Sequence, residues 1–113
     1  MARPLSTLPP AGTSEEAVCI PADHPSLPGH FPGLPVVPGV VLIDEVVTAC
    51  ESWLGVPLRI DAMPQVKFVA PLLPGETARA VLTWNGVDTI QFKLARESQA
   101  LAAGTLKVRA ANA

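Results

Sequence analysis

Two side chains in the first half of the sequence, His30 and Asp44, are of the types that move protons near neutral pH. An unperturbed imidazole has a pKa near ~6.5, so His30 can be neutral at cellular pH and accept a proton. Asp44 would donate a proton if it stayed protonated, and burial beside Val40 and Val41 would raise its pKa above the reference of about 3.9. The pair therefore predicts general acid–base chemistry, with His30 as the base and Asp44 as the acid.

A proline-rich loop would position the histidine. Residues 21–38 contain six prolines and two glycines, a density that excludes both a helix interior and a central strand. Apolar side chains in the same stretch, among them Phe31 and Leu34, favour an ordered loop that packs against the domain. Long ordered loops are commonly functional, so we expect this loop to carry part of a site.

A single amphipathic helix would position the aspartate. Pro38 and Gly39 begin the helix, which runs to about Leu54 and ends at Gly55. At 100° per residue the polar side chains fall within one arc of about 120°, and apolar side chains cover the opposite side. The polar arc comprises Asp44, Glu45, Thr48, Glu51 and Ser52. Glu45 lies about 100° from Asp44 around the helix, so we expect it on the surface and not in the site.

Alternating apolar and polar residues, separated by turn signals, predict that most of the remaining chain is antiparallel β-sheet. Asn85-Gly86 is a strong hairpin signal between two such segments. The expected strands are residues 15–22, 58–70 with a break at Pro64, 76–84, 88–96, and a last strand through Leu106 and Val108. One helix with these strands predicts an α+β fold, an antiparallel sheet wrapped around one long central helix. Residues 1–14 are expected to form a flexible N-terminal tail, and residues 15–113 a single domain.

The residues around His30 and Asp44 also resemble a known signature. The chain contains His30-Phe31-Pro32-Gly33, then Pro38-Gly39 at the predicted helix start, then the acid Asp44. This order is similar to that of 3-hydroxyacyl-[acyl-carrier-protein] dehydratases of the FabA/FabZ type, which have the hotdog fold. Further on, Val66-Lys67-Phe68 followed by Pro71 and Pro74-Gly75 resembles the strand and turn that this family places after its helix. The likeness covers roughly residues 16–109.

The resemblance implies an enzyme that dehydrates (3R)-3-hydroxyacyl groups on acyl carrier protein to trans-2-enoyl products, in fatty acid or polyene-type biosynthesis and without a cofactor. His30 would take the C2 proton, and Asp44 would protonate the leaving hydroxyl. The backbone amide of Gly39 would hold the thioester carbonyl as it gains enolate character, a role that suits the unpaired amides of a helix N-terminus. The expected substrate-binding residues are Phe31, Pro38, Gly39 and Val40.

The resemblance also implies an assembly. The family places its active sites at a two-fold interface, so we expect a homodimer, or a heterodimer with a second hotdog chain, in which His30 of one subunit faces Asp44 of the other. The acid is Asp, as in the FabA branch, and the chain lacks the helix and strand that the FabZ branch usually carries before its histidine loop. This short form resembles the dehydratases of aryl-polyene clusters.

Two alternative functions remain open on the same scaffold. The first is an acyl thioesterase, in which a carboxylate on the central helix would activate water. The second is a non-catalytic subunit that binds acyl chains and pairs with an active hotdog chain. Product analysis separates the first alternative from a dehydratase, because hydrolysis gives a free acid and a thiol.

Composition narrows the class of protein further. With 113 residues, 49% of them hydrophobic and 16% charged, the chain fits one globular domain. No apolar run approaches the ~20 residues of a membrane span, and no secretory signal is evident, so a cytoplasmic location is expected. Nucleic acid is not expected as a partner, because no basic run with aromatics occurs. Two histidines without zinc-ligand spacing argue against a metal site. Cys19 and Cys50 are expected to be reduced and buried.

Five basic side chains on the predicted strands could include a docking site for an acidic carrier protein, because complementary charge steers such encounters. They are Arg79, Lys93, Arg96, Lys107 and Arg109. The alternative is that they are ordinary solvent-facing strand residues.

Overall fold

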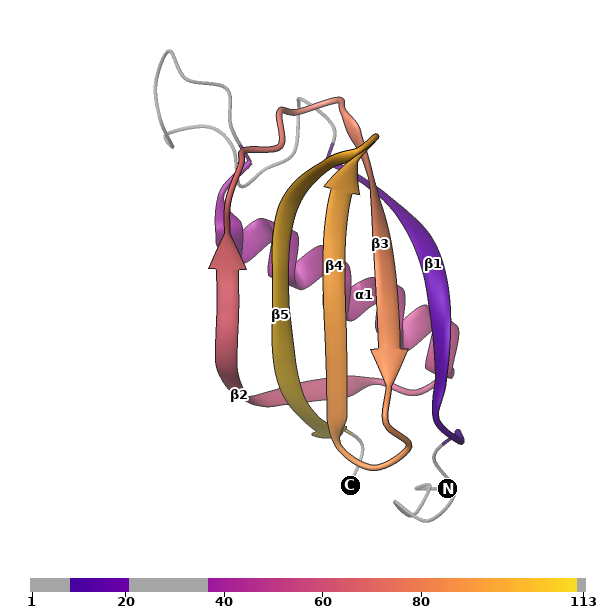
Figure 1. Cartoon of the computed structure of the whole chain (residues 1–113). Helices are drawn as coiled ribbons and strands as arrows, with labels where there is room; N and C mark the ends of the chain where they lie inside the picture. Colours follow the sequence, from indigo (N-terminus) through magenta and orange to yellow (C-terminus); the bar gives the residue numbers. More distant parts are fainter. Residues whose placement is uncertain (1–8, 21–36, 112–113) are drawn as a thin grey trace.

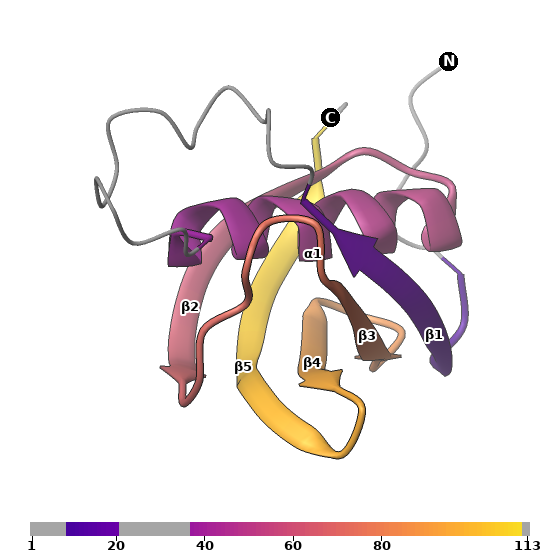
Figure 2. The same cartoon turned by 90° about the horizontal axis from the view of Figure 1, so that it is seen from above.

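One helix lies across one face of a five-stranded antiparallel sheet, which curves around it (Figures 1 and 2). The computed structural model describes residues 9–20 and 37–111. In chain order the elements are β1 (Gly12–Cys19), α1 (Gly39–Leu54), β2 (Leu58–Phe68), β3 (Thr77–Trp84), β4 (Thr89–Arg96) and β5 (Gln99–Ala110). The strand order is β1-β3-β4-β5-β2, so β1 and β2 are the edges. The predicted α+β architecture is confirmed.

The core fills the space between α1 and the concave face of the sheet. Side chains alternate along β3 and β4, and every second one is buried against the helix. Trp84 and Phe92 are the largest of them, each only 1% exposed. Complete burial of such a side chain contributes roughly 1.5–3 kcal/mol. From the helix, the buried residues are Val41, Leu42, Ile43, Val46, Cys50 and Leu54.

Backbone and side-chain hydrogen bonds fix the C-terminal end of α1. Gly55 adopts a left-handed conformation with φ of 75°, and its amide donates to the Glu51 carbonyl at 2.8 Å. The Glu51 carboxylate in turn accepts a hydrogen bond from the Leu58 amide at 2.8 Å. Glu51, expected only as part of a polar helix face, therefore ties the helix to the start of β2.

Only one of the two cysteines is buried, although both were expected to be. Cys50 is fully buried, and burial, with smaller contributions from Glu16 and Glu51, raises the pKa of its thiol to about 12. Cys19 is exposed. The expectation for Cys19 was wrong because the core-facing positions at this end of β1 are Val18 and Ile20.

Two strands differ from the sequence pattern, β1 in where it begins and β2 in having no break. β1 begins at Gly12, paired with Trp84 of β3, and so includes residues 12–14. β2 continues through Pro64, where a break was expected. Two register shifts against β5, between Ile60 and Ala62 and between Ala62 and Gln65, accommodate this stretch. An edge strand with such irregularities tolerates proline.

The predicted hairpin at Asn85-Gly86 is confirmed between β3 and β4. The Asn85 side-chain oxygen accepts hydrogen bonds from the amides of Val87, Asp88 and Thr89 at 2.8, 2.9 and 3.0 Å. Gly86 has φ of 85°. The Asn85 side chain thus replaces the backbone acceptor that a tighter turn would use.

Most of the proline-rich loop, predicted to be ordered, lies outside the described residues, as do residues 1–8 of the expected tail. Pro9, which also belongs to that tail, accepts a hydrogen bond through its carbonyl from the Trp84 indole at 2.9 Å. Within the described part of the chain, no helix is long and apolar enough to cross a membrane.

Candidate functional site

The N-terminal end of α1 presents backbone amides that the helix itself does not satisfy. Pro38 precedes the helix with φ of −60° and ψ of 146°, and no side chain of residues 9–20 or 37–111 caps its first turn. The Pro38 carbonyl accepts hydrogen bonds from Val41 and Leu42 at 3.0 and 3.2 Å. The amides of Gly39 and Val40 therefore have no acceptor within the helix, and they carry the positive end of its dipole. This end of α1 suits a carbonyl oxygen that gains negative charge.

Hydrogen bonds from neighbouring segments hold this helix end in place. The Val37 amide donates to the Leu72 carbonyl at 2.8 Å, which links the start of α1 to the connection between β2 and β3. That connection is tied to the end of β1, because the Gly75 amide donates to the Ile20 carbonyl at 2.7 Å. Pro38 itself is buried. The position of the Gly39 amide is thus fixed by three separate parts of the fold.

An apolar depression of about 440 Å³, the N-terminal hollow, adjoins Gly39. Val37, Gly39, Leu42 and residues 68–72 line it. The ring of Phe68 lies directly over Gly39: a Cβ atom built there would come within 2.9, 3.1 and 3.3 Å of three ring carbons. A side chain at position 39 would therefore force the ring to move, whereas glycine lets it lie against the backbone.

Asp44 lies on the outward face of α1, one turn after Val40. Both residues are exposed, Val40 by 68%. The predicted burial of Asp44 beside Val40 and Val41 is therefore not provided by the described residues, since only Val41 is buried. Glu45, expected on the surface, is half-buried. Asp44 and the Gly39 amide belong to the same end of one helix, about one and a half turns apart.

Exposed apolar side chains surround this end of the molecule. Besides Val40, they include Phe68 at 48% and Val69 at 58% exposure, from the end of β2 and the residue after it, and Met63, further back on β2, is 53% exposed. β2 is a sheet edge, with a hydrogen-bonded partner strand on one side only. An exposed apolar edge of this kind is typical of a protein–protein contact.

The expected site residues are only partly described. Pro38, Gly39, Val40 and Asp44 lie together at the start of α1, as the sequence predicted. His30 and Phe31 belong to residues 21–36 and lie outside the described residues. The pairing of His30 with Asp44 therefore stays a prediction. Among the residues that the structure does describe, no group of three or more His, Cys, Asp or Glu side chains could hold a metal ion.

The basic side chains suggested for carrier docking divide into two groups. Three of them make ion pairs: Arg96 with Glu76 at 2.7 Å, Lys107 with Asp88 at 3.7 Å, and Arg109 with Asp61 at 2.9 Å. Lys93 and Arg79 make no such pair within residues 9–20 and 37–111. Lys93 lines a second hollow together with Lys67.

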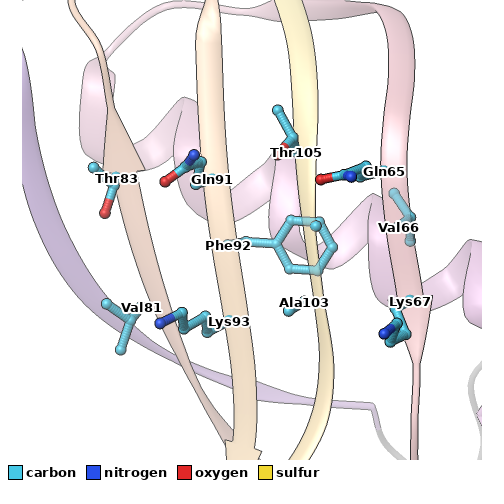
Figure 3. Close-up of a pocket in the computed structure, with 11 residues that line it drawn as sticks. Gln65, Val66, Lys67, Val81, Thr83, Gln91, Phe92, Lys93, Ala103 and Thr105 are labelled. Atoms are coloured by element: carbon cyan, nitrogen blue, oxygen red, sulfur yellow. The ribbon is translucent and has the colours of Figure 1, made fainter.

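That second hollow, of about 630 Å³, lies on the sheet face that points away from α1 (Figure 3). Its side chains come from β2, β3, β4 and β5, and Figure 3 shows Lys67 and Lys93 on either side of Ala103. The lining contains no carboxylate and no histidine among the described residues. It therefore lacks the residue types of the predicted acid–base pair, and the start of α1 is the better candidate for a catalytic site.

Sequence comparison identifies one family. The sequence profile of the ApeI-like family, described as ApeI dehydratase, matches residues 11–105. A curated relative, the 3-hydroxyacyl-[acyl-carrier-protein] dehydratase FabZ of Ehrlichia chaffeensis, is 31% identical over 93 residues, which are 78% of this chain and 64% of that protein. Two further FabZ proteins are matched over 51% and 63% of their length. The chain thus spans about a half to two thirds of the length of these relatives.

Solved structures of other proteins share this fold. The dehydratase heterocomplex ApeI:P from Xenorhabdus doucetiae contains a similar chain, with a TM-score of 0.75 and 25% identity, covering 85% of this chain and 86% of that one. The fluoroacetyl-CoA thioesterase FlK has a TM-score of 0.68 at 16% identity, with 93% of this chain and 89% of that one covered. That second likeness concerns the fold alone. The predicted hotdog fold is confirmed.

Proposed function

The chain belongs to the ApeI-like dehydratase family, and on that premise we propose that it removes water from (3R)-3-hydroxyacyl groups carried by an acyl carrier protein. The product would be the trans-2-enoyl thioester, in fatty acid or polyene-type biosynthesis. The observation that carries this proposal is the placement of Asp44 and the Gly39 amide within the first one and a half turns of α1, with an apolar hollow of about 440 Å³ beside Gly39.

The proposed reaction needs three groups. His30 takes a proton from C2, and the electron pair left behind forms the C2–C3 double bond. The C3–oxygen bond breaks as Asp44 gives its proton to the leaving hydroxyl, which departs as water. The Gly39 amide donates a hydrogen bond to the thioester carbonyl, whose oxygen gains negative charge while the C2 proton leaves. The partial positive charge of the helix N-terminus strengthens this donor.

A partner chain would complete the site. In the proposed arrangement, His30 of one subunit meets Asp44 of the other, and the exposed apolar side chains of β2 and Val40 become buried between them. In this arrangement the partner chain would also cover Asp44, which is exposed in the single chain. The partner is a second copy or another hotdog chain.

Turnover of defined substrates tests the activity. The purified chain is incubated with 3-hydroxybutyryl and 3-hydroxyoctanoyl carrier protein, and mass spectrometry detects the loss of water. We expect His30→Ala and Asp44→Asn to lower the rate by roughly 10²-fold or more, as for other general acids and bases. Glu45→Gln, a change of the adjacent carboxylate, is the matched control and should keep the wild-type rate. Equal rates for Asp44→Asn and Glu45→Gln would reject the assignment, and release of free 3-hydroxy acid would indicate a thioesterase.

Mixing the two inactive variants tests the shared site. If each site takes His30 and Asp44 from different subunits, co-refolded His30→Ala and Asp44→Asn chains should regain roughly a quarter of the activity, because half of the dimers are mixed and each holds one intact site. No recovery would place both residues in one subunit. Activity that appears only when a second hotdog chain is added would identify a heterodimer.

A further inference from the structure

We propose that Phe68 is a specificity-determining residue, whose ring over Gly39 restricts the site to acyl groups without a substituent at C2. This inference rests on the proposed function, because it assumes that a thioester carbonyl binds at the Gly39 amide. It concerns a side chain that has no part in proton transfer. It follows from the contact between the Phe68 ring and Gly39.

The Phe68 ring lies close to the place where the reacting end of the substrate would bind. A carbonyl oxygen bound to the Gly39 amide lies about 2.9 Å from the nitrogen, so C2 of the acyl group lies within about 5 Å of it. The ring carbons approach to within 2.9–3.3 Å of the point where a Cβ on Gly39 would be. The reacting end of the acyl group and the ring are therefore neighbours on the same side of the helix start.

The backbone beneath the ring is fixed, so Phe68 cannot retreat as a whole. It pairs with Ala102 across β2 and β5. The next two amides, those of Val69 and Ala70, both donate to the Leu101 carbonyl, at 2.8 and 3.2 Å. Only rotation of the side chain can move the ring. The size of the side chain at position 68, and not a movement of β2, should therefore determine how much space the acyl group has beside Gly39.

The surroundings of the ring identify what it selects. The N-terminal hollow is apolar, with Val37, Leu42 and Leu72 in its lining, so it accepts hydrocarbon and offers no partner to a polar substituent. The ring remains 48% exposed, and its uncovered part faces outward. An unbranched chain can pass along that part, whereas a methyl group at C2 would have to enter the volume already filled by the ring. Exclusion of one methyl group by packing corresponds to a preference of about 10- to 200-fold.

A comparison of two substrates tests this role. The measured quantity is the ratio of kcat/KM for 3-hydroxybutyryl and 2-methyl-3-hydroxybutyryl carrier protein. We expect the wild-type chain to prefer the unbranched substrate by at least about tenfold, and Phe68→Ala to lower this ratio by about tenfold or more. Phe68→Leu, which keeps an apolar side chain, should give an intermediate ratio. Val87→Ala trims another exposed apolar side chain, in the β3–β4 hairpin, and should keep the wild-type ratio.

A ratio that is the same in Phe68→Ala and wild type would overturn the inference, because a purely structural role would lower both rates equally. Failure of the proposed function looks different: neither substrate would then lose water with the wild-type chain. In that case, calorimetric binding of the amide analogues of the two substrates, in which nitrogen replaces the thioester sulfur, still tests the inference. Equal discrimination by wild type and Phe68→Ala would again reject it.

The contact itself has an independent readout. Gly39→Ala should destabilise the wild-type chain, because the new methyl group meets the ring at 2.9 Å, and should be tolerated far better in the Phe68→Ala background. Thermal unfolding of the four chains gives this coupling without any substrate. Additive shifts in melting temperature would show that the ring does not lie over Gly39.

Discussion

Gly104→Ala is expected to destabilise the chain strongly, because the backbone of β2 and the Phe92 ring of β4 both lie close to this glycine of β5. A Cβ atom at Gly104 would lie 2.6 Å from the Gln65 carbonyl oxygen, 2.9 Å from a ring carbon of Phe92 and 3.0 Å from the Val66 Cα. Two of these contacts are with the backbone of β2, which approaches β5 closely next to its register shift. The third is with the ring of Phe92, which is only 1% exposed.

The magnitude follows from how little these neighbours can move. Extra volume in a well-packed core costs typically about 1–3 kcal/mol, and the upper half of this range applies where backbone must shift. A loss of about 2–3 kcal/mol corresponds to a drop in Tm of roughly 8–12 °C for a domain of this size. Circular dichroism melts and urea unfolding, at one fixed protein concentration, measure both quantities.

Two further variants make this expectation specific. Gly12→Ala is the control, because its Cβ would meet only a Trp53 ring carbon at 3.6 Å, an ordinary contact, and its stability should stay within about 0.5 kcal/mol of wild type. In a Phe92→Leu background the cost of Gly104→Ala should fall but not vanish, since the Gln65 carbonyl remains. Equal Tm values for Gly104→Ala and Gly12→Ala would refute the reasoning.

Three further predictions concern single side chains. The pKa of the Cys50 thiol is raised to about 12, against 9.0 in the unfolded chain, so the folded state keeps the proton to higher pH. The free energy of unfolding should therefore fall as the pH rises from about 9 towards 12. Urea unfolding should show this slope in wild type and a shallower one in Cys50→Ala. Glu51→Ala removes the acceptor for the first amide of β2 and should cost about 1–2 kcal/mol, whereas Glu51→Gln should lose less, and equal losses in chemical unfolding would contradict the hydrogen bond. The pKa of Glu76 is lowered mainly by the hydrogen bond from the Leu73 amide and to a smaller extent by Arg96, so NMR should show its carboxyl titrating below the usual range. The stabilising contribution of this carboxylate should be lost as the pH falls through the lowered pKa. Arg96→Ala should restore only part of the shift.

Local sequence determined the helix and most of the strands. Pro38 and Gly39 start α1 because proline fixes φ and has no amide to satisfy, and Gly55 ends it because the left-handed cap favours glycine. Both effects act within a few residues, so they are visible without the fold. The same holds for the placement of Asp44 about one and a half turns from Gly39, which is a property of the helix alone.

Positions governed by partner strands could not be predicted in the same way. Residues 12–14 join β1 because β3 offers them hydrogen-bonding partners, although their own side chains show no apolar alternation. Pro64 remains inside β2 because that strand is an edge, whereas the sequence pattern alone had indicated a break at this proline. The strand order depends on contacts between residues far apart in the chain.

The same distinction between local and long-range effects applies to the candidate site. The sequence marked Phe68 only through its resemblance to a family motif, and nothing local indicated that its ring would cover Gly39, because β2 must first pack beside the start of α1. The ion pair of Arg109 with Asp61 similarly arises from the pairing of β2 with β5. Residue types and short-range geometry thus determined the chemistry available in the chain. Long-range packing decided which side chains lie beside the candidate catalytic groups, because only the folded sheet brings residues that are far apart in the sequence within contact distance.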